Sequence, residues 1–160
     1  FQPPVRGRNQ ALALFRFLER AECRGAGDLD AALTDYARRY PRPGMVVVVS
    51  DFLVPGAGVT GLKHLRYAKN EVFALQVLHP AELAPEAGGD LKLVDVEVGG
   101  FRELTLTSSV LKAYRSELRK HNQQLEDWCK KAGVGYLQAS TVETLETLVV
   151  GALRKSGLLA

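Results

Sequence analysis

The sequence predicts an α/β protein in which helices flank a parallel sheet. Three short apolar runs, at 46–49, 72–78 and 134–140, lack the polar alternation of a half-exposed strand. Such runs are typical of parallel strands that are covered on both faces. The segments around them repeat apolar residues at helical spacing. A chain of 160 residues has the size of one ordinary domain, so we expect residues 1–160 to form a single domain.

Two helices are expected before the first strand. Asn9 is the candidate cap of a helix that has apolar residues at 11, 14, 15 and 18 and ends near Cys23. Asp28 opens a second helix, whose apolar stripe is the clearest in the chain. This helix stops at Pro41, because proline does not continue a helix interior.

The strand at 46–49 is followed by a short helix at about 60–68 and by the strand at 72–78. This order makes a βαβ unit, whose crossover is nearly always right-handed. Because the valines of the first strand do not alternate with polar residues, we expect Val47, Val48 and Val49 all to be inaccessible to water.

An antiparallel hairpin is expected around 91–106. Apolar and polar residues alternate on both sides of Gly99-Gly100, which is the signal of a two-residue turn. Glu97 and Arg102 should then face each other across the two strands.

Two more helices complete the predicted fold. The longest runs from about Ser108 to Gly133 and carries apolar residues at spacings of three and four. The strand at 134–140 leads into a last helix, for which Ser140 and Glu143 form a candidate capping box.

Composition excludes several classes of protein. The net charge is +3, and the basic residues are interspersed with acidic ones, so we expect no nucleic-acid binding. No apolar run reaches the roughly 18 residues of a membrane span, so we expect no membrane insertion by this segment. The two cysteines lie far apart and show no zinc-site spacing, which fits a reducing cytoplasm.

One motif supports an alternative function. The segment "GAGVTG", Gly56 to Gly61, has the G-x-G-x-x-G pattern between a strand and a helix, and Glu82 lies at about the distance of a ribose-binding acid. The alternative is therefore a nucleotide-binding doubly wound domain that uses this loop. Against it, five residues separate the strand from the first glycine, whereas a pyrophosphate site needs the glycine at the strand end.

We expect the protein not to be an enzyme, because its candidate catalytic residues form no recognised constellation. The chain has no Walker-type loop and no G-x-S-x-G nucleophile elbow, and His64, His79 and His121 lack the spacing of metal ligands. His121 falls in the apolar stripe of the long helix and is better interpreted as a packed or partly buried side chain.

The most informative polar residues are Ser50 and Asp51, directly after the first strand. Ligands of open α/β sheets bind just outside the carboxyl ends of the strands. A loop cap, in which Asp51 accepts hydrogen bonds from nearby backbone amides, is the structural alternative.

The order of segments is similar to that of a known family. "RGR" before a helix, "GDLDAAL", "VVVVSDF", "LQVLHPAEL", "VDVEVGG" and "STVETLETLVVGAL" together resemble the C-terminal half of family 58 of the domains of unknown function. The resemblance implies a von Willebrand factor A-like domain with a Rossmann-like parallel sheet. It also implies a metal-ion-dependent adhesion site at the carboxyl ends of the strands, which we call the crest.

The implied metal site is partial in this chain. In the family, a D-x-S-x-S loop, a threonine from a second loop and an aspartate from a third hold a divalent cation, and Asp51 matches the third. No D-x-S-x-S occurs, and Gly27 followed by Asp28 stands where the second loop has its threonine and aspartate. The resemblance therefore implies Asp51 as metal ligand, with Ser50, Gly27 and Asp28 at the same crest and magnesium bound in the full-length protein.

The expected function is that of a non-enzymatic adaptor for protein–protein interaction. The resemblance implies a MoxR-type AAA+ ATPase as the partner. Because the strand that would carry D-x-S-x-S is absent beside the strand that precedes Asp51, we also expect self-association through the uncovered strand.

Overall fold

The computed structural model describes Gln2 and the ranges 5–22, 27–85, 89–94, 101–144 and 146–148. The chain divides into two compact units. One comprises Phe1–Gly27 and Val94–Phe101, and the other comprises Asp28–Leu93 and Arg102–Ala160.

The N-terminal unit contains a short 3-10 helix, η1 (Arg8–Gln10), followed by α1 (Ala11–Glu19). The prediction that Asn9 caps this helix is wrong, since Asn9 lies inside η1 and Gln10 occupies the N-cap position without a side-chain bond. None of the α1 side chains is buried.

The second unit is built on a parallel three-stranded sheet with the order β1-β2-β5. Its strands are β1 (Met45–Ser50), β2 (Glu71–Leu78) and β5 (Gly135–Ser140). The helix α3 (Val59–Tyr67) connects β1 to β2. The predicted βαβ unit and the parallel sheet flanked by helices are therefore confirmed.

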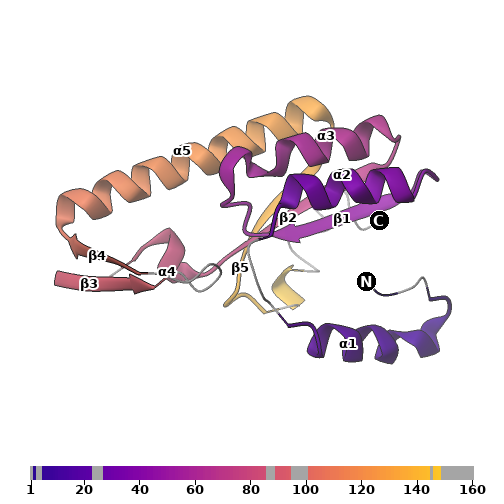
Figure 1. Ribbon diagram of the computed structural model, residues 1–160, viewed down its shortest axis with the longest axis horizontal. Coiled ribbons are helices and arrows are strands. Elements are labelled where there is room, and N and C mark those ends of the chain that lie inside the picture. The colour runs from indigo at the N-terminus through magenta and orange to yellow at the C-terminus, as the bar shows by residue number, and fades with distance from the viewer. Residues whose placement is uncertain are drawn as a thin grey trace. The chain divides into compact units, whose positions relative to one another are not determined.

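The helices α2 (Leu29–Arg39), α3 and α5 (Ser108–Ala132) lie on the same side of this sheet (Figure 1). The predicted start of α2 is confirmed, because the Asp28 carboxylate accepts a hydrogen bond from Ala31 N at 2.9 Å. The predicted end of α5 is confirmed as well. Gly133 follows it with a φ of 66°, a conformation that suits glycine at a helix C-terminus.

The core lies between the sheet and these three helices. Val48, Val72 and Ala74 contribute the sheet side, and they meet buried residues of the helices and loops: Phe52, Ala57, Leu62, Leu65, Leu125, Cys129 and Val134. Burial, with a smaller effect of Glu126, raises the pKa of the Cys129 thiol to about 12. This cysteine is thus an unreactive packing residue.

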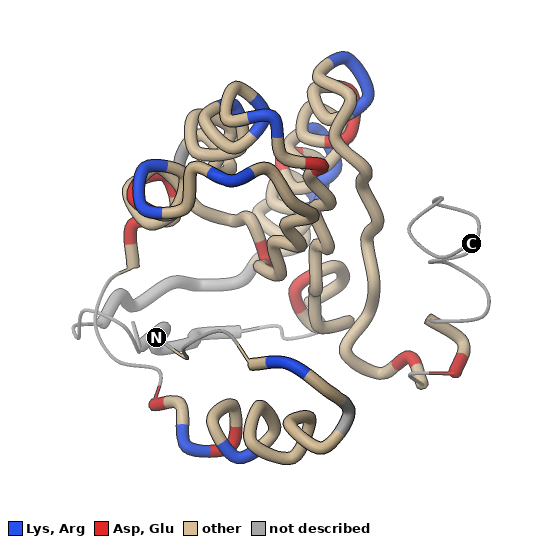
Figure 2. The backbone as a smooth tube through the Cα atoms, turned by 90° about the vertical axis from the view of Figure 1, so that its right-hand side faces the viewer, with Lys and Arg blue, Asp and Glu red and all other residues tan. Residues whose placement is uncertain are grey.

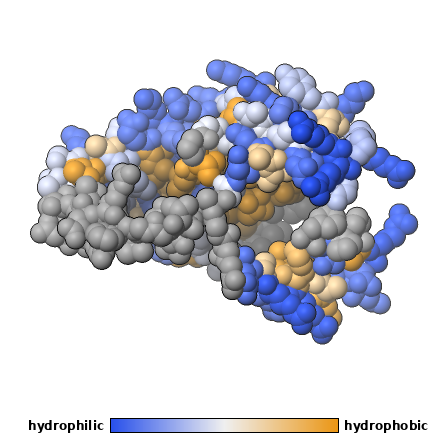
Figure 3. Space-filling model, in the orientation of Figure 1, coloured by the Kyte–Doolittle hydropathy of each residue, from blue (hydrophilic) through white to orange (hydrophobic). Residues whose placement is uncertain are grey.

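The opposite face of β1 is open, so the prediction that Val47 and Val49 are inaccessible is wrong. Val48 is 6% exposed, but Val47 is 45% and Val49 is 62% exposed. Among the described residues, β1 is an edge strand that pairs with β2 alone. The helices α2, α3 and α5 cover only one face of the sheet. Figure 3 shows hydrophobic side chains in a band at the level of the sheet, beneath the hydrophilic surfaces of α2 and α3.

A separate two-stranded sheet joins β3 (Gly89–Val94) to β4 (Phe101–Leu106). The strand β4 falls in the range predicted for a hairpin, and β3 begins two residues before it. Its turn, with Gly99, Gly100 and Glu97, lies outside the described residues, so the antiparallel hairpin stays a prediction.

The chain after β5 differs from the predicted capping box. Ser140 is the last residue of β5, and its hydroxyl accepts a hydrogen bond from Val142 N at 3.4 Å within a turn. Helical structure is seen from Glu146 to Leu148, and the rest of the predicted last helix lies outside the described residues.

The surface is mixed in charge, as the composition indicates. Basic and acidic residues are mixed along α2 and α5, whereas α3 carries Lys63 and Arg66 without an acidic residue (Figure 2). Within the part of the chain that the structure describes, no helix combines the length and the apolar character that crossing a membrane requires.

Candidate functional site

The loop that leaves β1 presents Asp51 at the crest. The Ser50 hydroxyl accepts a hydrogen bond from Phe52 N at 3.1 Å and lies 3.4 Å from Asp51 Oδ1, to which it donates. Asp51 Oδ1 also accepts a hydrogen bond from Leu53 N at 3.1 Å. The Asp51 side chain is exposed, and none of the described residues bonds to its second oxygen. The loop-cap interpretation is correct for one carboxylate oxygen, and the other has no partner among the described residues.

Phe52 anchors this loop in the core. Its side chain is 0% exposed, although its φ of 54° lies in the left-handed region, where a bulky residue is strained by about 1–3 kcal/mol. Two hydrogen bonds hold the strained backbone: Phe52 N donates to Ser50, and Phe52 O accepts from His121 Nε2 of α5 at 2.8 Å. The partly buried His121 predicted from the sequence is thus confirmed.

A buried glutamine makes the second attachment. Gln76 of β2 is 0% exposed, and its Nε2 donates to Asp51 O at 2.8 Å and to Asn122 Oδ1 of α5 at 3.1 Å. The hydroxyl of Tyr136 on β5 donates to Gln76 Oε1. The backbone of Asp51 is therefore connected through one side chain to α5 and β5.

The Tyr136 hydroxyl stays protonated over a wide pH range. Burial, followed by the charges of Glu126 and Cys129, raises its pKa from the ordinary 10 to about 12. Between pH about 10 and about 12 the folded state keeps this proton while the unfolded state loses it. The free energy of unfolding therefore falls as the pH rises through this range. At neutral pH the hydroxyl is therefore protonated and can donate to Gln76.

The other predicted crest residues do not join Asp51 in a metal site. Asp28 uses its Oδ1 to cap α2, and Gly27 has no side chain to offer. Over the described ranges, no group of three His, Cys, Asp or Glu side chains could hold a metal ion. Magnesium usually needs one or two carboxylates with further oxygen ligands, so the residues present do not fit a magnesium site.

The "GAGVTG" segment has a packing role. It spans the 3-10 helix η2 (Pro55–Gly58) and the first turn of α3. A Cβ on Gly58 would lie 2.6 Å from Leu29 Cδ2, and one on Gly61 would lie 2.6 Å from Leu33 Cβ. Both glycines are therefore needed for the close approach of α2 to α3.

An aspartate already occupies the helix end that a phosphate would need. Asp30 Oδ1 of α2 accepts a hydrogen bond from Gly61 N at 2.6 Å, in the first turn of α3. Glu82, the candidate ribose-binding acid, accepts from His79 N at 2.6 Å and forms a capping box at α4 (Pro80–Leu83). Both observations count against the nucleotide-binding alternative.

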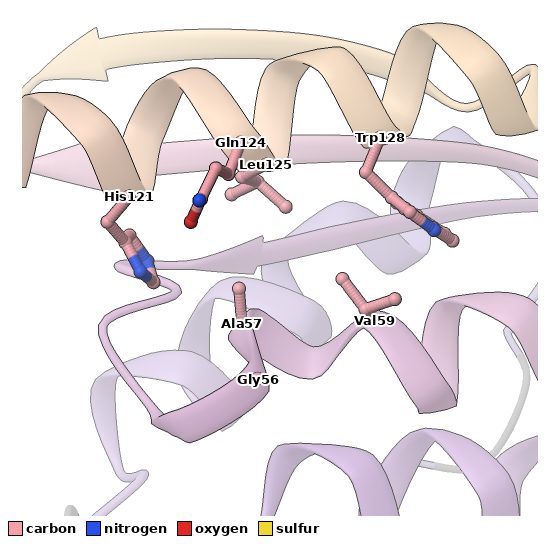
Figure 4. A pocket seen from close by; sticks show the side chains of 7 residues that line it. All are labelled: Gly56, Ala57, Val59, His121, Gln124, Leu125 and Trp128. Atoms are coloured by element: carbon pink, nitrogen blue, oxygen red, sulfur yellow. The ribbon is translucent and has the colours of Figure 1, made fainter.

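A pocket opens beside the crest, between η2, the start of α3 and α5 (Figure 4). Its volume is about 260 Å³. His121 and Trp128 point from α5 toward η2 and α3. The lining residues are Gly56, Ala57, Val59, His121, Gln124, Leu125 and Trp128.

Sequence reasoning missed the residues that fasten the crest. Gln76 was detectable, because it is the one polar residue in the apolar run "VFALQVL", and a polar residue inside a buried strand needs hydrogen-bond partners. Asn122 gives no such signal, since it sits among polar residues of the long helix.

The family of the chain follows from its match to a family model. The model described as "Protein of unknown function DUF58" matches residues 1–124, which is more than half of the 160 residues. The chain belongs to the DUF58 family. The resemblance inferred from the sequence is confirmed at this level.

The relatives are uncharacterized proteins of mycobacteria. A protein of Mycobacterium avium is 30% identical over 142 residues, which cover 87% of this chain and 83% of that protein. Proteins of Mycobacterium bovis and Mycobacterium tuberculosis are 30% identical over 115 residues, which cover 72% of this chain and 36% of each. The chain thus matches about a third of the length of these longer DUF58 relatives. No solved structure matches it.

Proposed function

We propose that this DUF58 chain is a non-enzymatic protein-binding domain that presents the Asp51 crest to a partner protein. The observation that supports this proposal is the way Asp51 is held. Its side chain is exposed, whereas Phe52 and Gln76, which fasten its backbone, are 0% exposed. A charged group on a rigid support loses little conformational freedom when a partner binds it.

Binding explains this arrangement better than acid–base catalysis does. A catalytic carboxylate must reach the proton that it transfers, and burial or neighbouring titratable groups usually tune its pKa. In the described part of the chain, Asp51 bonds to Ser50 and Leu53, and His121 is directed to the carbonyl of Phe52.

The resemblance supplies the identity of the proposed partner. Proteins of the resembled type are thought to act as adaptors of MoxR-type AAA+ ATPases, so we assign this role, in the cytoplasm, to the present chain. The domain would be the C-terminal portion of a von Willebrand factor A-like domain, and magnesium would bind only with ligands from elsewhere in a full-length protein.

The replacement Asp51→Asn tests the proposal. Asparagine still accepts the bond from Leu53 N, so the loop is kept while the charge is lost. We expect affinity for a purified MoxR-type ATPase from the same organism, measured by biolayer interferometry, to fall at least about tenfold, or about 1.4 kcal/mol. Asp35→Asn is the matched control, because Asp35 is an exposed carboxylate on α2 that pairs with Arg39.

Equal binding by the wild type and both variants would contradict the role of Asp51, and no binding by any of them would contradict the ATPase as partner.

The nucleotide alternative is checked with the same protein by thermal melts with NAD, ATP and magnesium. A nucleotide at 100 times its dissociation constant adds about 2.7 kcal/mol of stability, and we expect no such shift.

Within the described residues, β1 is an edge strand with an open face, and this supports the expected self-association. Met45, Val47 and Val49 are 55%, 45% and 62% exposed, and β1 contains no charge, proline or bulge to protect its edge. Antiparallel pairing of β1 with β1 of a second copy is self-complementary and would extend the sheet.

We therefore expect sedimentation to show a dimer or larger species, and Val49→Lys to shift it to the monomer by placing a charge on the edge. Val142→Lys is the control, because Val142 is 67% exposed in the turn after β5. A wild-type monomer, or equal association of both variants, would disprove pairing through β1.

A further inference from the structure

We propose that the pocket between η2 and α5 is a second part of the Asp51 surface, and that it takes one bulky apolar side chain of the bound partner segment. A lysine or arginine of the same segment would pair with Asp51. This inference rests on the proposed function, since it specifies which chemistry the crest recognises.

The walls of the pocket suit an apolar side chain. Leu125 is 2% and Ala57 is 7% exposed, and Val59 and Trp128 pack against the same core. Small-molecule sites usually measure about 300–1,000 Å³, whereas this pocket has about 260 Å³. Its size therefore fits a single anchoring residue, which is the unit that dominates the energy of many protein interfaces.

The rim of the pocket is polar and has a defined hydrogen-bonding character. His121 Nε2 lies 2.8 Å from Phe52 O, and a carbonyl oxygen only accepts, so Nε2 carries the hydrogen. In the neutral ring Nδ1 is then an acceptor, and none of the described residues donates to it. Gln124 is exposed on the same rim and offers both a donor and an acceptor. These two groups can satisfy the backbone of a bound segment.

His121 also links the two parts of the surface. Its ring lines the pocket and is bonded to Phe52, the residue directly after Asp51. An extended segment advances about 3.3 Å per residue. The apolar anchor and the basic residue of the partner should therefore lie close together in the partner's sequence.

Charge complementarity selects the basic residue. Asp51 is exposed, and none of the described residues bonds to its second oxygen or forms an ion pair with this carboxylate. A guanidinium or ammonium group at this point gains a charge-assisted hydrogen bond that no side chain of the described residues supplies.

A substitution that fills the pocket separates this inference from the proposed function. Gln124→Phe places a ring over the pocket from an exposed position of α5. Gln123→Phe is the matched control, because Gln123 is the exposed neighbour that does not line the pocket and bonds to Asp127 instead. We expect Gln124→Phe to lower the affinity for the MoxR-type ATPase at least about tenfold and Gln123→Phe to leave it within about twofold.

The class of ligand is tested with two tetrapeptides, N-acetyl-Phe-Gly-Gly-Arg-amide and N-acetyl-Phe-Gly-Gly-Glu-amide. Trp128 is the only tryptophan of the chain and lines the pocket, so its fluorescence reports occupancy. We expect the Arg peptide to change the emission of Trp128 at concentrations at least about fivefold lower than the Glu peptide needs. This preference should disappear in Asp51→Asn, and both responses should disappear in Gln124→Phe.

If Gln124→Phe kept full affinity for the ATPase while Asp51→Asn lost affinity, the inference that the pocket binds the partner would be overturned. The proposed function would remain intact. Equal responses to the two peptides would overturn the joint use of the pocket and Asp51. If Gln124→Phe and Asp51→Asn both kept full affinity for the ATPase, the proposed function itself would be contradicted.

Discussion

Replacing Phe52 by alanine is expected to lower the free energy of unfolding by about 3–5 kcal/mol, the usual cost of removing a buried phenylalanine side chain. Phe52 is 0% exposed and belongs to the core cluster of the second unit. Chemical denaturation followed by circular dichroism measures this change. It is the largest single-residue effect that we expect in the described structure.

Two companion variants identify the cause. Leu53→Ala changes the next residue, which is 37% exposed, and should cost less than about 1.5 kcal/mol because little of its side chain leaves a packed environment. Phe52→Gly should be about 1 kcal/mol less destabilising than Phe52→Ala, since glycine adopts the φ of 54° without steric strain. If Phe52→Ala cost no more than Leu53→Ala, the placement of Phe52 in the core would be wrong.

Replacing Gln76 by leucine should give the second largest effect, a loss of about 3 kcal/mol. The substitution conserves size but removes the partners of Asp51 O, Asn122 Oδ1 and the Tyr136 hydroxyl. Each buried polar group left without a partner costs about 1–3 kcal/mol. Because the same bonds fasten the crest, amide hydrogen exchange at 51–53 should also become faster.

Gln138→Leu is the control for this prediction. Gln138 of β5 is the register partner of Gln76 but is exposed, so the change should stay within about 0.5 kcal/mol. The double variant Gln76→Leu/Tyr136→Phe should be less destabilised than the sum of its two single variants, because the second change removes a hydroxyl that the first leaves unpaired. Strict additivity would show that the bond between Gln76 and Tyr136 contributes nothing.

The elements that depend on local sequence were predictable. Asp28 capping α2, the apolar stripe of α5 and Gly133 at its end are signals carried by neighbouring residues, and the structure confirms each of them. The parallel pairing of the strands also followed from their apolar runs and from the helix between β1 and β2. Membership of the DUF58 family, which the resemblance predicted, is shown by the family-model match over residues 1–124.

The features that depend on partners distant in sequence were decided by the tertiary structure alone. An apolar run cannot show whether its strand lies at an edge, so the exposure of Val47 and Val49 depended on which helices cover the sheet. Likewise, Gly61 serves packing because Asp30 and Leu33 of α2 lie against it. Asp51 was identifiable from its place after β1, but its rigid support comes from distant residues. Gln76 bonds to Asp51 across 25 positions of the chain, and His121 bonds to Phe52 across 69. Hydrogen bonds and close contacts of this kind form only when the helices and strands have packed, and a local sequence pattern does not encode them.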